Sequence, residues 1–114
     1  MILLNPKYDI EVKNLERDSH GRFIILDTNM NDTTLVLINL YAPSDLSQQV
    51  QFFDRITDKL SKYADENIII GGDFNCSLTH LDKVGGKPVE NKKCVMDKIS
   101  NLINLYSLHD VCRE

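Results

Sequence analysis

The chain has 114 residues, of which 42% are hydrophobic and 26% are charged; this fits one small folded domain or a piece of a larger one and excludes a disordered composition. The formal net charge of −4 argues against a module that holds nucleic acid by bulk electrostatics, because such modules are usually basic. No apolar run reaches the ~20 residues of a membrane span, and Asn5-Pro6 interrupts the apolar opening, so neither a membrane segment nor a secretory signal is predicted.

Three β-strands are predicted in the first half of the chain. Apolar and charged residues alternate over residues 8–15, the pattern of a half-buried strand. Turn residues at 18–21 precede a short β-branched run at 22–28. A second turn at 29–32 leads to residues 33–41 (TTLVLINLY), a nearly continuous apolar run of the kind buried on both faces of a sheet.

A helix is predicted after the third strand. Pro43 ends that strand, and Ser44 or Ser47 is expected to cap the helix. Apolar residues then recur at helical spacing from Leu46 to Tyr63, with polar residues between them.

A fourth strand, a loop and a second helix complete the predicted order. Residues 67–70 (NIII) form a compact strand that Gly71-Gly72 closes. A loop runs from Asp73 to about Asn91, roughly 18 residues, a length that in a compact domain usually indicates function. Apolar residues between 96 and 106 then recur at the spacing of an amphipathic helix.

This order predicts a mixed α/β fold, of the α+β layered kind, in which helices pack on a sheet. No internal repeat or linker is visible, so residues 1–114 are interpreted as one unit. Because the first residues are already strand-like, we expect a partial domain rather than a whole one.

Polar residues follow the fourth strand in the segment GGDFN. Side chains at the carboxyl end of a buried strand face the crevice where α/β proteins bind ligands. There Asp73 can hold a metal or orient a water, and Asn75 can donate to a phosphate oxygen. Phe74 is expected to anchor the loop in the core. The simpler interpretation is an ordinary strand exit, in which Gly, Asp and Asn are common.

A second polar group ends the other buried strand, in the segment 39–43 (NLYAP). A strand–helix–strand unit makes its two strands parallel, so both carboxyl ends open on one edge. Tyr41 and Asp73 are therefore predicted to face the same crevice, where a phenol can stabilise the charge on a phosphate undergoing substitution. By itself, Tyr41 could equally be a half-buried aromatic residue at a strand end.

Together, Asn-x-Tyr-x-Pro and the later strand-Gly-Asp-x-Asn resemble the endonuclease/exonuclease/phosphatase superfamily. The sequence of residues 35–83 (LVLINLYAPSD, then IIIGGDFNCSLTHLDK) is most similar to the DNA endonuclease domains of LINE-type retrotransposons, relatives of the abasic-site endonucleases. The resemblance implies a fragment of a four-layer β-sandwich flanked by helices. Residues 1–114 would be its central part, without the N-terminal strands and the C-terminal catalytic strands.

The resemblance also implies roles for matching residues. Asp73 matches the Asp that binds metal or positions the attacking water, and Asn75 matches the Asn that binds the scissile phosphate. Tyr41 matches the phosphate-contacting Tyr, and Asn39 the structural amide of its motif. Retrotransposon members often have Asn after the Pro, so Ser44 puts that substrate contact in doubt. The implied cofactor is Mg²⁺ (or Mn²⁺), and the implied partner of the intact parent is DNA.

Other family residues have no counterpart. The metal-binding Glu lies upstream in the family and the Asp-His pair lies downstream, whereas His109-Asp110 comes too early and in reverse order. Because such groups act as a unit, the chain alone is expected to be nearly inactive.

Lysines make the loop after GDFN basic. Lys87 and Lys92 are candidate DNA contacts, although a solvated loop explains them equally well. His80 is interpreted as an exposed loop residue. The three cysteines, Cys76, Cys94 and Cys112, form no metal or disulfide pattern and indicate reduced, mostly buried thiols in an intracellular protein, with the nucleus as one candidate compartment.

The leading hypothesis is a truncated, metal-dependent phosphodiesterase domain resembling the DNA-nicking endonuclease of a retrotransposon. One alternative keeps the superfamily and changes the substrate to an inositol phosphate or lipid phosphodiester. The other is a non-catalytic relic or interaction module.

Overall fold

The computed structural model describes residues 1–75 and 90–111, with the backbone alone for residues 90–93. The chain divides into two compact units. The sheet unit comprises residues 1–42 and 63–73, and the helical unit comprises residues 43–62 and 74–114.

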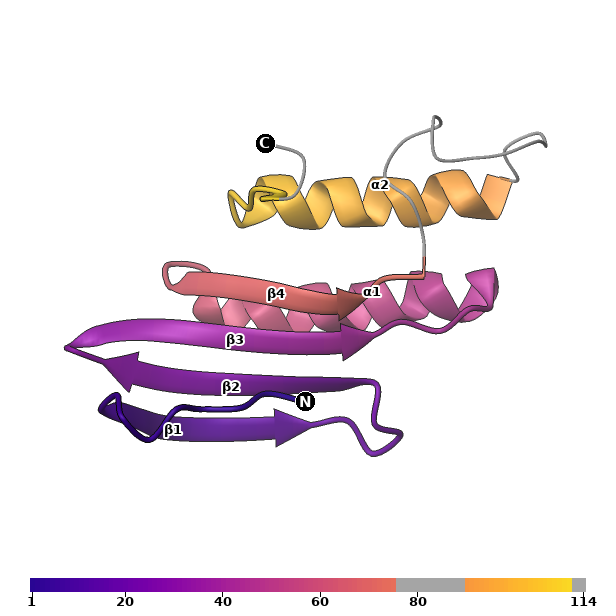
Figure 1. The fold of residues 1–114 in the computed structure, drawn as a ribbon. Helices are drawn as coiled ribbons and strands as arrows, with labels where there is room; N and C mark the ends of the chain where they lie inside the picture. The colour runs from indigo at the N-terminus through magenta and orange to yellow at the C-terminus, as the bar shows by residue number, and fades with distance from the viewer. Residues whose placement is uncertain (76–89, 112–114) are drawn as a thin grey trace. The chain divides into compact units, whose positions relative to one another are not determined.

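The sheet unit contains four strands in the order β1-β2-β3-β4, which Figure 1 shows side by side. They are β1 (Ile10–Arg17), β2 (Phe23–Met30), β3 (Thr33–Tyr41) and β4 (Asn67–Asp73). The β1–β2 and β2–β3 pairs are antiparallel, and β3 and β4 are parallel. The parallel pair follows from the long connection between those strands, since a tight turn can join only antiparallel neighbours.

Alternation along β3 divides its side chains between two faces of the sheet. Val36, Ile38 and Leu40 are buried, whereas Leu35 and Leu37 are half-buried. Burial is therefore less complete than the apolar sequence of 33–41 predicts.

The first strand departs further from prediction. Most of β1 is exposed, and Val12 is 47% exposed, so the prediction of a half-buried strand over 8–15 is wrong. The register shifts between Val12 and Asn14, which indicates a bulge at this position. β1 is an edge strand of the sheet, paired only with β2 among the described strands, and a bulge is a common feature of such an edge.

A tight turn sets the β2–β3 register. Met30 pairs with Thr33, and the residues between them, Asn31 and Asp32, have φ of 53° and 62°. Two successive left-handed residues are characteristic of the hairpin turn whose twist matches that of the flanking strands, and Asn and Asp tolerate this conformation better than most residues.

The helical unit contains α1 (Leu46–Leu60), a short 3₁₀ helix (Ser61–Tyr63) that runs on into the sheet unit, and α2 (Glu90–Leu105). Asp45 caps α1, because its carboxylate accepts hydrogen bonds from the Ser47 backbone N–H (2.8 Å) and from the Ser47 hydroxyl (2.7 Å). The prediction that Ser44 or Ser47 is the cap is therefore wrong. An ionised carboxylate accepts these hydrogen bonds more strongly than a hydroxyl does.

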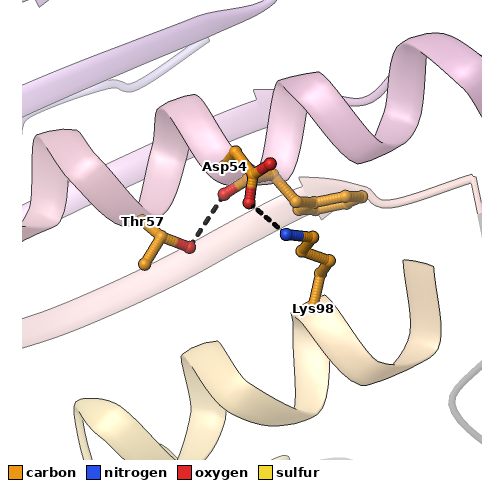
Figure 2. Close-up of polar contacts among 4 residues, drawn as sticks. Asp54, Thr57 and Lys98 are labelled. Carbon is orange, nitrogen blue, oxygen red and sulfur yellow. Dashed lines mark hydrogen bonds and ion pairs between the residues drawn. The ribbon is translucent and has the colours of Figure 1, made fainter. Parts of the chain in front are cut away.

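Polar contacts link α1 to α2 within this unit. Lys98 Nζ lies 2.7 Å from Asp54 Oδ1, a contact drawn in Figure 2, and this hydrogen bond raises the pKa of Lys98. The Tyr106 hydroxyl donates to the Thr57 carbonyl oxygen at 2.9 Å, and burial raises the pKa of Tyr106. Apolar residues of α1 and α2 are buried, including Phe53 and Leu102.

The mixed α/β fold class is confirmed, with a four-stranded sheet and two helices. The strand at Thr33–Tyr41 has the predicted bounds, and α1 begins at the predicted Leu46. Within the described part of the chain, no helix combines the length and the apolar character that crossing a bilayer requires.

Candidate functional site

The carboxyl ends of β3 and β4 meet at one edge of the sheet. Tyr41 is the register partner of Asp73, and the backbone N–H of Ala42 donates to the Asp73 carbonyl oxygen at 2.8 Å. The predicted parallel arrangement of these strands is therefore confirmed. Tyr41 is 55% exposed, and Asp73 is also exposed, so a solvent-borne ligand can reach both.

Asn39 lies two residues before Tyr41 on β3. It pairs in register with Gly71, and alternation along the strand places it on the same face as Tyr41. Its side-chain amide donates to the Met1 carbonyl oxygen at 3.2 Å. This contact agrees with a structural amide, and a role for Asn39 in substrate binding stays a prediction.

The two glycines have unequal structural roles. Gly72 has a φ of 129°, and a Cβ built on it would lie 1.9 Å from the Leu40 carbonyl oxygen. A Cβ on Gly71 would meet nothing within 4 Å. Both glycines lie inside β4 rather than after it, so the prediction that the strand ends at Ile70 is wrong. The absence of a Cβ at Gly72 lets the backbones of β3 and β4 approach closely just before Asp73.

Arg22, immediately before β2, lies beside Tyr41. The Tyr41 backbone N–H donates to the Arg22 carbonyl oxygen at 2.7 Å, which continues the β2–β3 register one position beyond the Phe23–Leu40 pair. The guanidinium carbon of Arg22 lies 5.6 Å from the centre of the Tyr41 ring, within the range of a cation–π interaction. Sequence reasoning missed this residue, because 22–28 was interpreted only as an apolar strand. The signal was the turn at 29–32, because the tight turn at Asn31 and Asp32 sets the β2–β3 register and with it the residue opposite Tyr41.

Asn75 and Ser44 lie in the helical unit, whereas Tyr41 and Asp73 lie in the sheet unit. Asn75 has a φ of 50°, and its carbonyl oxygen accepts a hydrogen bond from the Gln49 side-chain amide at 3.0 Å. That amide also donates to the Pro43 carbonyl oxygen at 2.6 Å, so buried Gln49 holds the two segments that bear Ser44 and Asn75. That Asn75 and Ser44 share a site with Asp73 stays a prediction.

Phe74, between Asp73 and Asn75, anchors its segment in the helical unit. Its ring stacks on that of Phe53 in α1, with centroids 6.1 Å apart and an interplanar angle of 6°. The prediction that Phe74 anchors the loop in the core is confirmed for this unit.

The described residues do not form a complete metal site. Within residues 1–75 and 94–111, no three His, Cys, Asp or Glu side chains are grouped so that they could hold a metal ion. The edge formed by Arg22, Tyr41 and Asp73 supplies a single carboxylate. Mg²⁺ requires near-octahedral coordination by oxygen, so Asp73 alone does not complete a site.

Several residues singled out from the sequence lie outside the described part of the chain. Lys87 and His80 are among them, and Lys92 lies in α2, where only its backbone is described. Cys94 is an exposed free thiol, contrary to the expected burial for this residue, and Cys76 and Cys112 lie outside the described residues. The next residue in α2, Val95, is buried. Adjacent helical positions do not share a face, so Cys94 can be exposed beside it.

Comparison with known proteins relates the chain to a mobile element. The chain is 31% identical over 113 residues to the transposon TX1 uncharacterized 149 kDa protein of Xenopus laevis, an alignment that covers 98% of this chain and 8% of that protein. The chain is thus related to a small segment of a transposon protein. No family model matches it.

The fold is similar to part of a solved structure. A crystal structure of beta toxin from Staphylococcus aureus superposes with a TM-score of 0.52 and 16% identity, covering 91% of this chain and 38% of the toxin chain. This likeness concerns the fold alone.

Proposed function

We propose that the chain carries part of a metal-dependent DNA endonuclease domain of the endonuclease/exonuclease/phosphatase superfamily, derived from a LINE-type retrotransposon. The observation that carries the proposal is the register pairing of Tyr41 with Asp73 at the ends of two parallel strands. The relationship to a transposon protein supports the retrotransposon origin. The motifs NxYxP and GDxN, which supply Tyr41 and Asp73, support the superfamily.

In the proposed reaction, water attacks the phosphorus of a DNA phosphodiester in line with one sugar oxygen. The carboxylate of Asp73 orients the water and accepts its proton as the new oxygen–phosphorus bond forms. The bond to the departing sugar oxygen breaks, and this oxygen takes a proton from solvent. The Tyr41 hydroxyl donates to a non-bridging phosphate oxygen, whose negative charge grows in the transition state.

Neighbouring residues complete the proposed contact with DNA. Asn75 binds the scissile phosphate, Asn39 supports the strand end that bears Tyr41, and Ser44 supplies a weaker phosphate contact than Asn would. Lys87 and Lys92 are proposed contacts to more distant phosphates, whose energetic contribution falls with salt.

We propose Asp73 as one ligand of Mg²⁺ or Mn²⁺. The described side chains supply no three-ligand cluster, so the proposed ion needs further oxygen ligands besides Asp73. Substrate phosphates and waters commonly complete Mg²⁺ coordination when the protein contributes one or two carboxylates.

A DNA-binding experiment tests the proposal without requiring turnover. Anisotropy of a fluorescein-labelled DNA duplex is measured with the full chain, with and without Mg²⁺ at constant ionic strength. Mg²⁺ should tighten binding by the unchanged chain several-fold and have little effect on Asp73→Asn. Without a divalent cation, Asp73→Asn should bind more tightly than the unchanged chain, because a carboxylate beside a phosphate repels it.

Asp65→Asn is the matched control. Asp65 is exposed and precedes Asn67, so it lies at the opposite end of β4 from Asp73, and its substitution makes the same change in charge. This variant should retain the Mg²⁺ response of the unchanged chain. Equal responses of the two variants, or no binding by the unchanged chain at low salt, would refute the proposal.

A further inference from the structure

The turn before β2 has a well-defined hydrogen-bonded structure. Asp18 is 8% exposed, and its carboxylate accepts from the Arg22 backbone N–H at 3.1 Å. The Asp18 backbone N–H donates to the Phe23 carbonyl oxygen at 3.1 Å, and the Gly21 N–H donates to the Asp18 carbonyl oxygen at 3.0 Å. Gly21 has a φ of 72°, a left-handed conformation that glycine adopts without steric cost. Asp18 therefore determines where the backbone of Arg22 lies.

Arg22 is opposite Tyr41 in the sheet. Their backbones are joined by the 2.7 Å hydrogen bond from Tyr41 N–H, and the guanidinium lies over the Tyr41 ring. Tyr41 is in turn the register partner of Asp73. A guanidinium, a phenol and a carboxylate thus lie side by side across three neighbouring strands. We call Arg22, Tyr41 and Asp73 the cross-strand row.

A guanidinium in this position suits a phosphate. The N–H donors of a guanidinium lie in one plane, in a fork that matches two phosphate oxygens, and a cation–π contact with one ring does not use all of them. The whole chain carries a net charge of −4, so an anionic substrate needs a local positive group. Arg22 supplies this charge beside the phenol that is proposed to contact the phosphate.

We infer that Arg22 is a phosphate-binding residue of the site, which contacts the DNA backbone beside the phosphate bound by Tyr41. This inference rests on the proposed function. The cation–π contact holds the guanidinium in place before DNA arrives, which lowers the entropy lost on binding.

The test measures binding of the same labelled DNA duplex across a salt series, using Arg22→Gln and Arg22→Lys. Arg22→Gln should weaken binding about tenfold, the effect of losing one charge-assisted contact. It should also reduce the slope of log affinity against log salt by about 1, because one fewer phosphate is neutralised. Arg22→Lys keeps the charge without the fork and should retain the slope while recovering part of the affinity.

Arg17→Gln is the matched control, since Arg17 ends β1 at the same end of the sheet but pairs with β2 at Ile24, away from Tyr41. It should weaken binding less than Arg22→Gln. Circular dichroism of each variant checks the fold, and the backbone contacts of Arg22 are available to Gln and Lys as well.

The outcomes separate this inference from the proposed function. If the unchanged chain binds DNA with an Asp73-dependent Mg²⁺ response while Arg22→Gln and Arg17→Gln behave alike, the role of Arg22 is refuted and the proposed function stands. If the unchanged chain does not bind DNA, both are refuted. A misfolded Arg22→Gln leaves the decision to Arg22→Lys, which contradicts the inference if its affinity equals that of the unchanged chain.

Discussion

The two adjacent glycines in β4, Gly71 and Gly72, differ in whether the backbone could accommodate a side chain. Gly72 combines a φ of 129° with a close approach to the Leu40 backbone, whereas Gly71 has open space where a Cβ would be. The sequence motif GGD does not distinguish the two positions. The difference matters for the site because Gly72 directly precedes Asp73 and adjoins the residue before Tyr41.

We predict that Gly72→Ala destabilises the protein by about 2 kcal/mol or more, since it adds backbone strain and a clash with a main-chain oxygen that cannot move aside. Gly71→Ala should change stability by less than about 1 kcal/mol, in either direction. Urea unfolding followed by circular dichroism measures both variants. Equal unfolding midpoints for the two would contradict the close approach of β3 and β4 at Gly72.

At the scale of the secondary-structure elements, the N-terminus of α1 is capped by a single carboxylate, that of Asp45. Asp45 accepts two hydrogen bonds from Ser47, and the one from the Ser47 hydroxyl is the main reason that the pKa of Asp45 lies below its ordinary value. A group whose folded pKa is lowered stabilises the folded state when it is ionised. Its contribution is present above the ordinary carboxyl pKa of about 3.9 and is lost as pH falls through the lowered value.

We therefore predict that Asp45→Asn lowers the thermal midpoint at neutral pH, because an amide cap accepts these hydrogen bonds less strongly than an ionised carboxylate does. The difference from the unchanged chain should shrink below about pH 4 as Asp45 becomes protonated. Thermal melts at a series of pH values measure it, with Asp65→Asn as a substitution outside the helix. A difference that stays constant with pH would show that the charge of Asp45 does not contribute to the cap.

For the chain taken as one molecule, the described residues hold only some of the groups that the proposed phosphodiester hydrolysis would need. The cross-strand row offers one carboxylate, and no three-ligand metal cluster is found among the side chains of residues 1–75 and 94–111. The chain also corresponds to only 8% of its transposon relative. Catalytic groups that act together lose most of their effect when one is absent.

We predict that the chain alone nicks supercoiled plasmid in Mg²⁺ at no more than the background rate. Agarose gels of a time course, with and without the metal, provide the measurement, and Asp73→Asn controls for contaminating nuclease. Robust Mg²⁺-dependent nicking that Asp73→Asn abolishes would contradict the view that the site needs further groups.

Much of the secondary structure is predictable because it is local. The apolar run at Thr33–Tyr41 and the start of α1 at Leu46 follow from periodicity and from Pro43 between them. The parallel pairing of β3 with β4 follows from the helix that connects them, and with it the meeting of Tyr41 and Asp73. The cap was misassigned because Ser44, Asp45 and Ser47 are all good caps, and only the three-dimensional hydrogen bonds distinguish them.

Local sequence patterns were sufficient to predict the fold class and the parallel strands that bring the candidate phenol and carboxylate to one edge, because periodicity and turn residues act over a few positions. Only the folded chain reveals that Arg22 lies opposite Tyr41 and that Gly72, not Gly71, permits the close approach of β3 and β4. The first depends on which two residues form the turn between β2 and β3, and the second depends on the register between β3 and β4, which are distant in sequence. A shift of one residue in either pairing would place different side chains in the cross-strand row, and periodicity along a single strand does not specify that choice.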